Sequence, residues 1–267
     1  MKNNTPSPGY KNYLENIKKE KKLILLLQIA LLVGFIVVWE LLANFGIIET
    51  FLFSKPSDIY ALFIDYLKNG ELLTHVKISV FETLLGLIFG TLLGVIIAII
   101  LWYFPRLSKV LDPYLVVLNA LPKTALAPIL IVWIGAGIEG IVAIAIIISI
   151  VVTILSAYNY FINVDEDKIK MLKSFGATKT QILTKLILPS NIVNLINITK
   201  INIGMSWVGV IVGEFLVSRY GIGYLLLYGG QVFRLDLVMM GVFVLAICSW
   251  MMYAIVNCIE KYYSSKK

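Results

Sequence analysis

The run from Ile138 to Ala157 reads IEGIVAIAIIISIVVTILSA and contains a single charged side chain, Glu139. A helix of about 20 apolar residues is long enough to cross the hydrocarbon core of a bilayer. This run therefore predicts a transmembrane helix, and the sequence on either side of it decides how many more there are.

The composition of the whole chain extends this interpretation to all 267 residues. Hydrophobic side chains make up 59% of the chain and charged side chains only 15%, with a mean hydropathy of +0.88. Soluble domains are about 45–50% apolar and about 25% charged. This chain has more apolar surface than one core can bury, so the excess must face lipid, and a water-soluble globular enzyme is excluded.

Six apolar segments are long enough to cross a bilayer, which predicts an all-α, polytopic membrane protein. Pro122 and Pro128 interrupt the third segment, and each removes a backbone donor. Broken helices persist at membrane depth where they are buried or line a cavity, so these prolines mark either a pathway lining or a structural kink. The predicted spans are 23–43, 79–103, 114–134, 138–157, 192–216 and 235–259.

The distribution of lysine and arginine predicts the orientation, because cytoplasmic loops are enriched in both. Sixteen lie in the two tails and in the loops after the second and fourth spans, against five in the alternate connections. Both termini are therefore expected in the cytoplasm, and the net charge of +7 suits anionic lipid rather than nucleic acid. The predicted parts are a cytoplasmic tail (1–22), a first span with an external interfacial segment (23–78), a core (79–259) containing a cytoplasmic loop (158–191), and a cytoplasmic tail (260–267).

The cytoplasmic loop carries signals for two short amphipathic helices. The acidic residues 165–167 suit a helix N-terminus, and Gly176 suits a left-handed residue that ends a helix. Thr178 and Gln181 then fit a capping box that starts a second helix. From these residues alone the loop is either a hairpin on the lipid surface or a docking element for a cytoplasmic partner. The apolar residues at helical spacing are Ile169, Leu172 and Phe175, then Ile182, Leu183 and Leu186.

The loop resembles the "EAA…G…I-LP" loop of binding-protein-dependent ABC importer permeases, and the chain is most similar to the nitrate/sulfonate/taurine-type subunits. Gly176 and Pro189 stand at the motif's spacing, although Lys170, Met171 and Leu172 replace its Glu-Ala-Ala triplet. The changed charge would suit a matching acidic surface on a partner. Further similar stretches are 121–129 (LPKTALAPI), 133–135 (WIG), 174–178 (SFGAT) and 221–224 (GIGY) after Glu214.

The resemblance implies a type I ABC importer permease fold in the bacterial plasma membrane, with the loop docked as a coupling helix in a groove of a separate ATPase subunit. ATP would bind to that subunit, so this chain is expected to hold no cofactor and to be no enzyme. An extracytoplasmic substrate-binding protein and a second permease subunit, in a homodimer, are the other implied partners. The implied cargo is a nitrate-, sulfonate- or taurine-like molecule or a vitamin precursor. The expected docking residues are Lys170, Met171, Leu172, Phe175, Gly176, Ala177, Leu186, Leu188 and Pro189.

Charged residues within the spans bear on the function, since intramembrane charges are functional candidates. Glu214 lies near the outer end of the fifth span, where we expect it to reach water and to pair with Arg219 in a structural or gating role. Glu82 and His75 are interpreted as interfacial residues. The alternative function, a secondary transporter or channel, would need ion-coupling carboxylates near the span centres and an inverted repeat, and the sequence shows neither.

Glycines at spacing four mark two places of close helix packing. Gly86, Gly90 and Gly94 lie in the second span, and Gly209 and Gly213 lie in the fifth. We expect the first set to pack either inside the subunit or against another subunit, and the second set to pack inside the fold.

Overall fold

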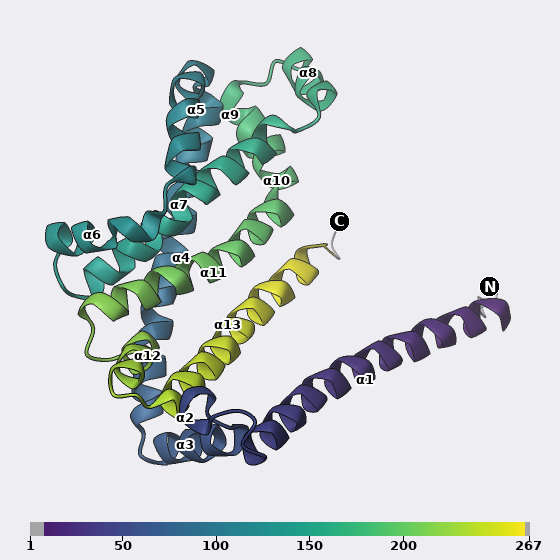
Figure 1. The fold of residues 1–267 in the computed structure, drawn as a ribbon. Coiled ribbons are helices and arrows are strands. Elements are labelled where there is room, and N and C mark those ends of the chain that lie inside the picture. Colours follow the sequence, from purple (N-terminus) through teal and green to yellow (C-terminus); the bar gives the residue numbers. More distant parts are fainter. Residues whose placement is uncertain (1–7, 265–267) are drawn as a thin grey trace. The chain divides into compact units, whose positions relative to one another are not determined.

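The computed structural model describes residues 8–264, and every regular element in that range is a helix. Residues 1–7 and 265–267, which include Lys2, Lys266 and Lys267 of the predicted tails, lie outside the described residues. The chain divides into two compact units, Met1–Leu62 and Phe63–Lys267. Figure 1 shows the helices of both.

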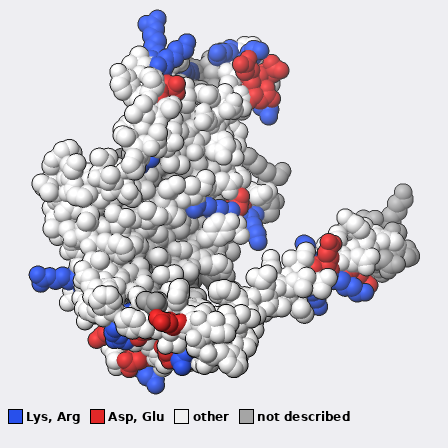
Figure 2. All heavy atoms as spheres, viewed as in Figure 1, with Lys and Arg blue, Asp and Glu red and all other residues white. Residues whose placement is uncertain are grey.

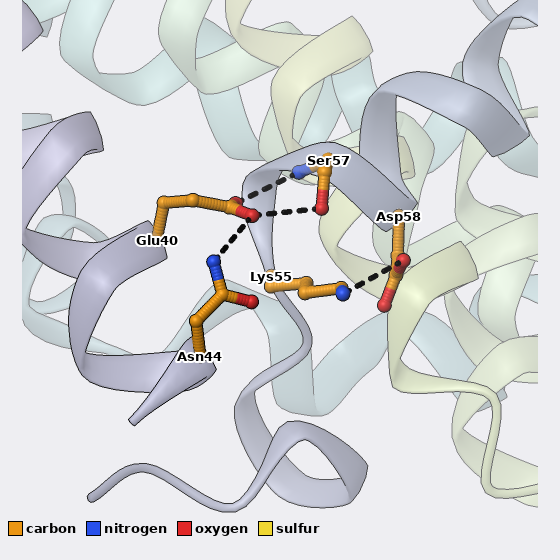
Figure 3. Close-up of polar contacts among 5 residues, drawn as sticks. All are labelled: Glu40, Asn44, Lys55, Ser57 and Asp58. Atoms are coloured by element: carbon orange, nitrogen blue, oxygen red, sulfur yellow. Dashed lines mark hydrogen bonds and ion pairs between the residues drawn. The ribbon is translucent and has the colours of Figure 1, made fainter. Parts of the chain in front are cut away.

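The first unit contains α1 (Pro8–Asn44), α2 (Thr50–Phe53) and the start of α3 (Pro56–Lys68). The carboxylate of Glu40 in α1 accepts hydrogen bonds from the backbone N–H of Ser57 at 3.1 Å and from its hydroxyl at 2.9 Å (Figure 3). The first N–H groups of a helix have no partner within it, so Glu40 caps α3 from outside. Pro56 opens α3 with Asp58 in the first turn, where proline loses no intrahelical bond and an acidic side chain is favoured.

The second unit contains the end of α3 and all the helices that follow it in the described chain. They are α4 (Glu71–Tyr103), α5 (Pro105–Ala120), η1 (Lys123–Leu126), α6 (Ala127–Ile134), α7 (Ile138–Ile162), α8 (Glu166–Ser174), α9 (Lys179–Ile182), η2 (Leu183–Ile187), α10 (Leu188–Ser190), α11 (Ile192–Val217), α12 (Ile222–Gln231) and α13 (Leu235–Ser264).

The centre of this unit is α7, which packs against both α4 and α11. Glycines allow the close approach on both sides. A methyl group at Gly86 of α4 would lie 2.5 Å from Cβ of Ala145, and one at Gly209 of α11 would overlap the Ala145 backbone. Gly94 meets Thr153 of α7 in the same way. The glycines of α4 and α11 thus pack inside the subunit, which decides between the two expectations for the α4 set.

Polar side chains join the same three helices deep inside the unit. The Asn202 side-chain amide in α11 donates to the hydroxyl of Thr91 in α4 at 2.8 Å and to that of Thr153 in α7 at 2.7 Å. At the other face of α11, Lys200 forms an ion pair with Glu260 of α13 and donates to Asn257 at 2.9 Å. Such bonds matter where lipid supplies no competing hydrogen-bond partner.

The predicted spans are confirmed as helices, with corrections to their limits. Five described helices are long and apolar enough to cross a membrane: α4, α7, α11, α13 and residues 15–44 of α1. The third predicted span is instead a pair of helices, α5 and η1–α6, bent by 88°. Helix α12 was not predicted, because its ten residues behind the Gly221 turn are too few to cross a membrane.

The positions of the charged side chains in the second unit agree with this arrangement of helices. In Figure 2, Lys, Arg, Asp and Glu gather at the end that carries α8 and α9, whereas the long helices between the ends are mostly covered by uncharged residues. This distribution suits a chain whose middle faces lipid.

A methyl group at the α7–α11 crossing is predicted to destabilise the fold. Gly209→Ala would overlap the Ala145 backbone, and overpacking costs about 1–3 kcal/mol. The matched control is Gly204→Ala in the same helix, where nothing lies within 4 Å of the added Cβ. Thermal unfolding of the two purified proteins should show a lower midpoint for Gly209→Ala alone; equal midpoints would contradict the packing described here.

Candidate functional site

The connection between α7 and α11 is built as the sequence predicts. The Asp165 carboxylate accepts a hydrogen bond at 2.9 Å from a backbone N–H two residues later, which caps α8. Gly176 then adopts a left-handed backbone with φ of +77°. The N–H groups of Gly176 and Ala177 donate to the carbonyls of Lys173 and Leu172 at 2.9 and 3.0 Å. This Schellman motif ends α8 and turns the chain at once.

The second helix starts with the predicted capping box. The backbone N–H of Thr178 donates to the Gln181 side chain at 2.8 Å, and the Gln181 N–H donates back to the Thr178 hydroxyl at 3.3 Å. One turn of π-helix, η2, lies two residues before Pro189. There the Leu188 N–H donates to the Leu183 carbonyl, five residues back.

Residues 165–182, called the elbow below, have one partly buried and one exposed face. The Met171 side chain is 52% exposed and that of Phe175 is 81% exposed. Phe175 was predicted to share a face with Ile169 and Leu172, and this is wrong because α8 ends at Ser174 and Phe175 leaves the helical register. Partly buried hydrophobic residues at positions 169, 172, 177, 186 and 188 pack on a core cluster of Ala98, Ala157, Phe161, Ile182, Leu183, Ile187 and Ile198.

The nine expected docking residues therefore fall into two groups. Four of them support the elbow on the core cluster, and five are on the surface. The supporting residues are Leu172, Ala177, Leu186 and Leu188, and the surface residues are Lys170, Met171, Phe175, Gly176 and Pro189.

Lys170, which replaces the acidic residue of the resembled motif, is paired within its own helix. Its ammonium lies 3.6 Å from the Glu166 carboxylate and 3.3 Å from that of Asp167. All three side chains are exposed, and such pairs contribute about 1 kcal/mol or less. The elbow thus presents Lys170 within a patch of both charges.

Lys179 attaches the elbow to the end of α4. Its ammonium lies 5.7 Å from the ring centroid of Trp102 and 5.0 Å from that of Tyr103, within the range of cation–π attraction. The same ammonium donates a hydrogen bond to the Tyr103 carbonyl. The elbow is therefore joined to α4 by a polar contact as well as by the core cluster.

The prolines expected to line a pathway lie at the bend between α5 and α6. Pro122 is the residue before η1, with φ of −70° and ψ of 91°, and it stands at the break in the helix pair. Pro128 lies in the first turn of α6, where no intrahelical donor is lost. Pro128 therefore starts a helix and does not interrupt one, while both prolines are exposed.

Glu214 is buried, contrary to the expectation that it reaches water. One carboxyl oxygen accepts from the Ser79 hydroxyl and the other from the Gly223 N–H, both at 2.5 Å. The α11–α12 turn folds over the end of α11, and a side chain at Gly221 would overlap the carboxyl group. Arg219 is exposed and forms no ion pair with Glu214 among the described residues.

His75 and Glu82 are also buried inside the protein. α4 begins at Glu71, so both lie inside this helix, where His75 shares a hydrogen bond of 2.9 Å with the Gly221 N–H and stacks on Tyr224. Sequence reasoning missed this cluster. The signal was present, because His75, Ser79 and Glu82 are spaced by four and three residues and so form one stripe on a helix.

The described residues contain no group of three or more His, Cys, Asp or Glu side chains that could hold a metal ion. Two candidate sites stand out: the elbow, with its exposed apolar and charged side chains, and the buried Glu214 cluster.

A profile of the family described as "Binding-protein-dependent transport system inner membrane component" matches residues 90–267. Among curated proteins, a probable ABC transporter permease protein of Haemophilus influenzae is 28% identical over 86% of this chain and 94% of its own length. The putative aliphatic sulfonates transport permease protein SsuC of Bacillus subtilis is 24% identical over 85% and 82%.

The fold has a solved counterpart in an inward-facing structure of the MetNI methionine ABC transporter. The TM-score is 0.65, with 15% identity over 71% of this chain and 94% of the matched one. At that identity the likeness shows the fold alone.

Loss of the capping box is predicted to loosen the elbow. Thr178→Ala removes the acceptor for the Gln181 N–H, at a cost of about 1 kcal/mol. Hydrogen exchange measured by mass spectrometry should speed up several-fold across residues 178–182. Thr180→Ala, in the same helix and outside the capping box, is the control; equal exchange in both variants would argue against the cap.

Proposed function

Since the chain belongs to the family of binding-protein-dependent transport system inner membrane components, we propose that it forms the translocation pathway of an ATP-binding cassette importer and that its ATPase subunit docks on the elbow. The observation that carries the docking proposal is the exposure of Met171 and Phe175 on a rigidly supported loop. Large exposed apolar side chains on a built element are typical of a partner interface.

The packing of the elbow on the core cluster provides a physical route by which movement of the ATPase subunits would reach the membrane helices. ATP binding would draw two ATPase subunits together and move the elbows docked on them. The elbow rests on residues of α4, α7, η2 and α11 in one core cluster, so it cannot move without shifting the ends of these helices. The partner would thereby bias inward-open against outward-open states through contacts that differ between them.

A second copy of the chain would complete the pathway. Val132 and Trp133 of α6 are 81% and 78% exposed, and the exposed bend at Pro122 and Pro128 lies beside them in the chain. Exposed aromatic surface favours an intersubunit position, with the bend lining the passage between the copies. Both termini and the elbow would face the cytoplasm, and a substrate-binding protein would deliver cargo on the other side.

The relatives' names suggest the class of cargo. They include permeases for aliphatic sulfonates in Bacillus subtilis, taurine in Escherichia coli and formylaminopyrimidine in Halalkalibacterium halodurans. We propose a small polar molecule of the sulfonate or vitamin-precursor type, selected mainly by the binding protein. A secondary transporter or channel would instead show uptake without the ATPase.

Truncation of the exposed apolar tip is predicted to weaken docking. Phe175→Ala combined with Met171→Ala should lower the amount of co-purified ATPase and ATP-dependent uptake by about tenfold, because central aromatic contacts are each worth about 1–2 kcal/mol or more. Phe81→Ala is the control, since Phe81 is 53% exposed on α4. Unchanged co-purification of the double variant would overturn the docking proposal.

Reversal of the charge at Lys170 tests whether the partner surface that binds the elbow is acidic. Lys170→Glu leaves the supporting residues intact but places a third acidic side chain beside Glu166 and Asp167. If the partner groove is acidic, the variant should bind the ATPase several-fold more weakly at low salt and approach the unaltered chain at high salt. A salt-independent result would show that charge has no part in docking.

The glycine at the turn of the elbow offers a matched pair of variants. Gly176 and Gly70 share a φ of +77°, and nothing lies within 4 Å of a Cβ at either. Alanine at each position costs about 1–2 kcal/mol of backbone strain. Only Gly176→Ala should reduce ATPase co-purification; equal loss in Gly70→Ala would mean that the effect is general destabilisation.

A further inference from the structure

The buried carboxyl groups of Glu82 and Glu214 form a pair that the proposed transport function does not use. Glu82 is 1% exposed and Glu214 is fully buried. Their side chains are joined by a hydrogen bond between α4 and α11. Neither carboxyl group forms an ion pair with a lysine or arginine in the part of the chain that the structure describes.

A hydrogen bond between two carboxyl groups requires a proton on one of them. Ionised carboxylates only accept hydrogen bonds, and two of them in contact inside a protein repel strongly. Two carboxyl groups in such contact are therefore expected to share one proton, and the surroundings of each group decide which residue holds it.

The hydrogen-bond donors around the pair are distributed very unequally. Glu214 accepts from the Ser79 hydroxyl, the Gly223 N–H and the backbone of Tyr224. Ser79 is itself fixed by an N–H donor from Ile222 at 2.7 Å, so its own proton points to Glu214. In contrast, no hydrogen-bond donor within the described residues reaches Oε2 of Glu82.

We propose that Glu82 is a buried proton-binding site: it is a neutral carboxylic acid that donates its proton to the Glu214 carboxylate. A carboxylate surrounded by donors is stabilised in its charged form, whereas a buried carboxyl group without donors is stabilised in its neutral form. The pair then carries one negative charge, and that charge lies on the residue that the protein solvates.

With the proton on Glu82, that proton has a structural role. Glu214 holds the first turn of α12 through the Gly223 N–H, and Glu82 holds Glu214 to α4. His75 and Ser79 of α4 bind the same α11–α12 turn at Gly221 and Ile222. The proton on Glu82 thus completes a junction of three helices, in which Glu82 acts as a positioning residue for Glu214.

The test is infrared spectroscopy of the full-length protein at neutral pH, in a detergent without ester carbonyls. The carbonyl stretch of a protonated carboxylic acid is separate from carboxylate bands and shifts in deuterated water. The unaltered protein should show this band, Glu82→Gln should lose it, and Glu214→Gln should lose a carboxylate signal instead. Glutamine at position 82 can still donate to Glu214, so its unfolding midpoint should stay close to that of the unaltered protein.

A leucine variant separates the effect of the proton on stability from the effect of side-chain packing. Glu82→Leu keeps most of the side-chain volume but cannot donate, so its unfolding midpoint should fall below that of Glu82→Gln. Loss of a carboxylate signal in Glu82→Gln would overturn the proposal and indicate an ionised pair bridged by a cation. If only Glu214→Gln lost the acid band, the proton would lie on Glu214, and the proposal would be overturned. None of these readouts depends on transport, so they stand apart from the proposed function.

Discussion

The close contact of α4 and α11 with Ala145 of α7 is the constraint on which the second unit depends. Apolar side chains gain little by leaving lipid for a helix interface, so packing and hydrogen bonds must hold the helices together. The missing side chains at Gly86 and Gly209 bring the backbones near enough for Asn202 to bond to hydroxyl groups on both neighbouring helices. The polar junction around Glu214 lies nearer one end of the same helices, where the α11–α12 turn folds over them.

The elbow belongs to this packing and is not an appendage to it. Its apolar face is completed by Phe161 of α7 and Ile198 of α11, while Lys179 reaches the end of α4. A partner that moves the exposed face would therefore act on the three helices that define the core. Under the proposed function, this continuity would let the elbow transmit movement of an ATPase subunit to the membrane helices.

Local signals allowed the elbow to be predicted, whereas tertiary contacts decided the features that were missed. The cap at Asp165, the left-handed Gly176 and the capping box at Thr178 each involve residues within a few positions of one another. The burial of Glu214 instead depends on Ser79, 135 positions away, and on a turn whose glycines leave space for the carboxyl group. The bend between α5 and α6 was underestimated for a similar reason, since a proline shows where a helix breaks but not the 88° by which its halves diverge.

The π-turn before Pro189 has a consequence for the length of the chain. Proline has no N–H to donate to the carbonyl four residues back, and the turn over Leu183–Ile187 absorbs that defect with one residue more than an α-helical turn would hold. Each residue rotates a helix by about 100°, so this extra residue sets the phase of the elbow relative to α11. Leu188 packs against the core cluster in that phase, so an inserted or deleted residue between Gly176 and α11 would rotate the elbow away from its present packing.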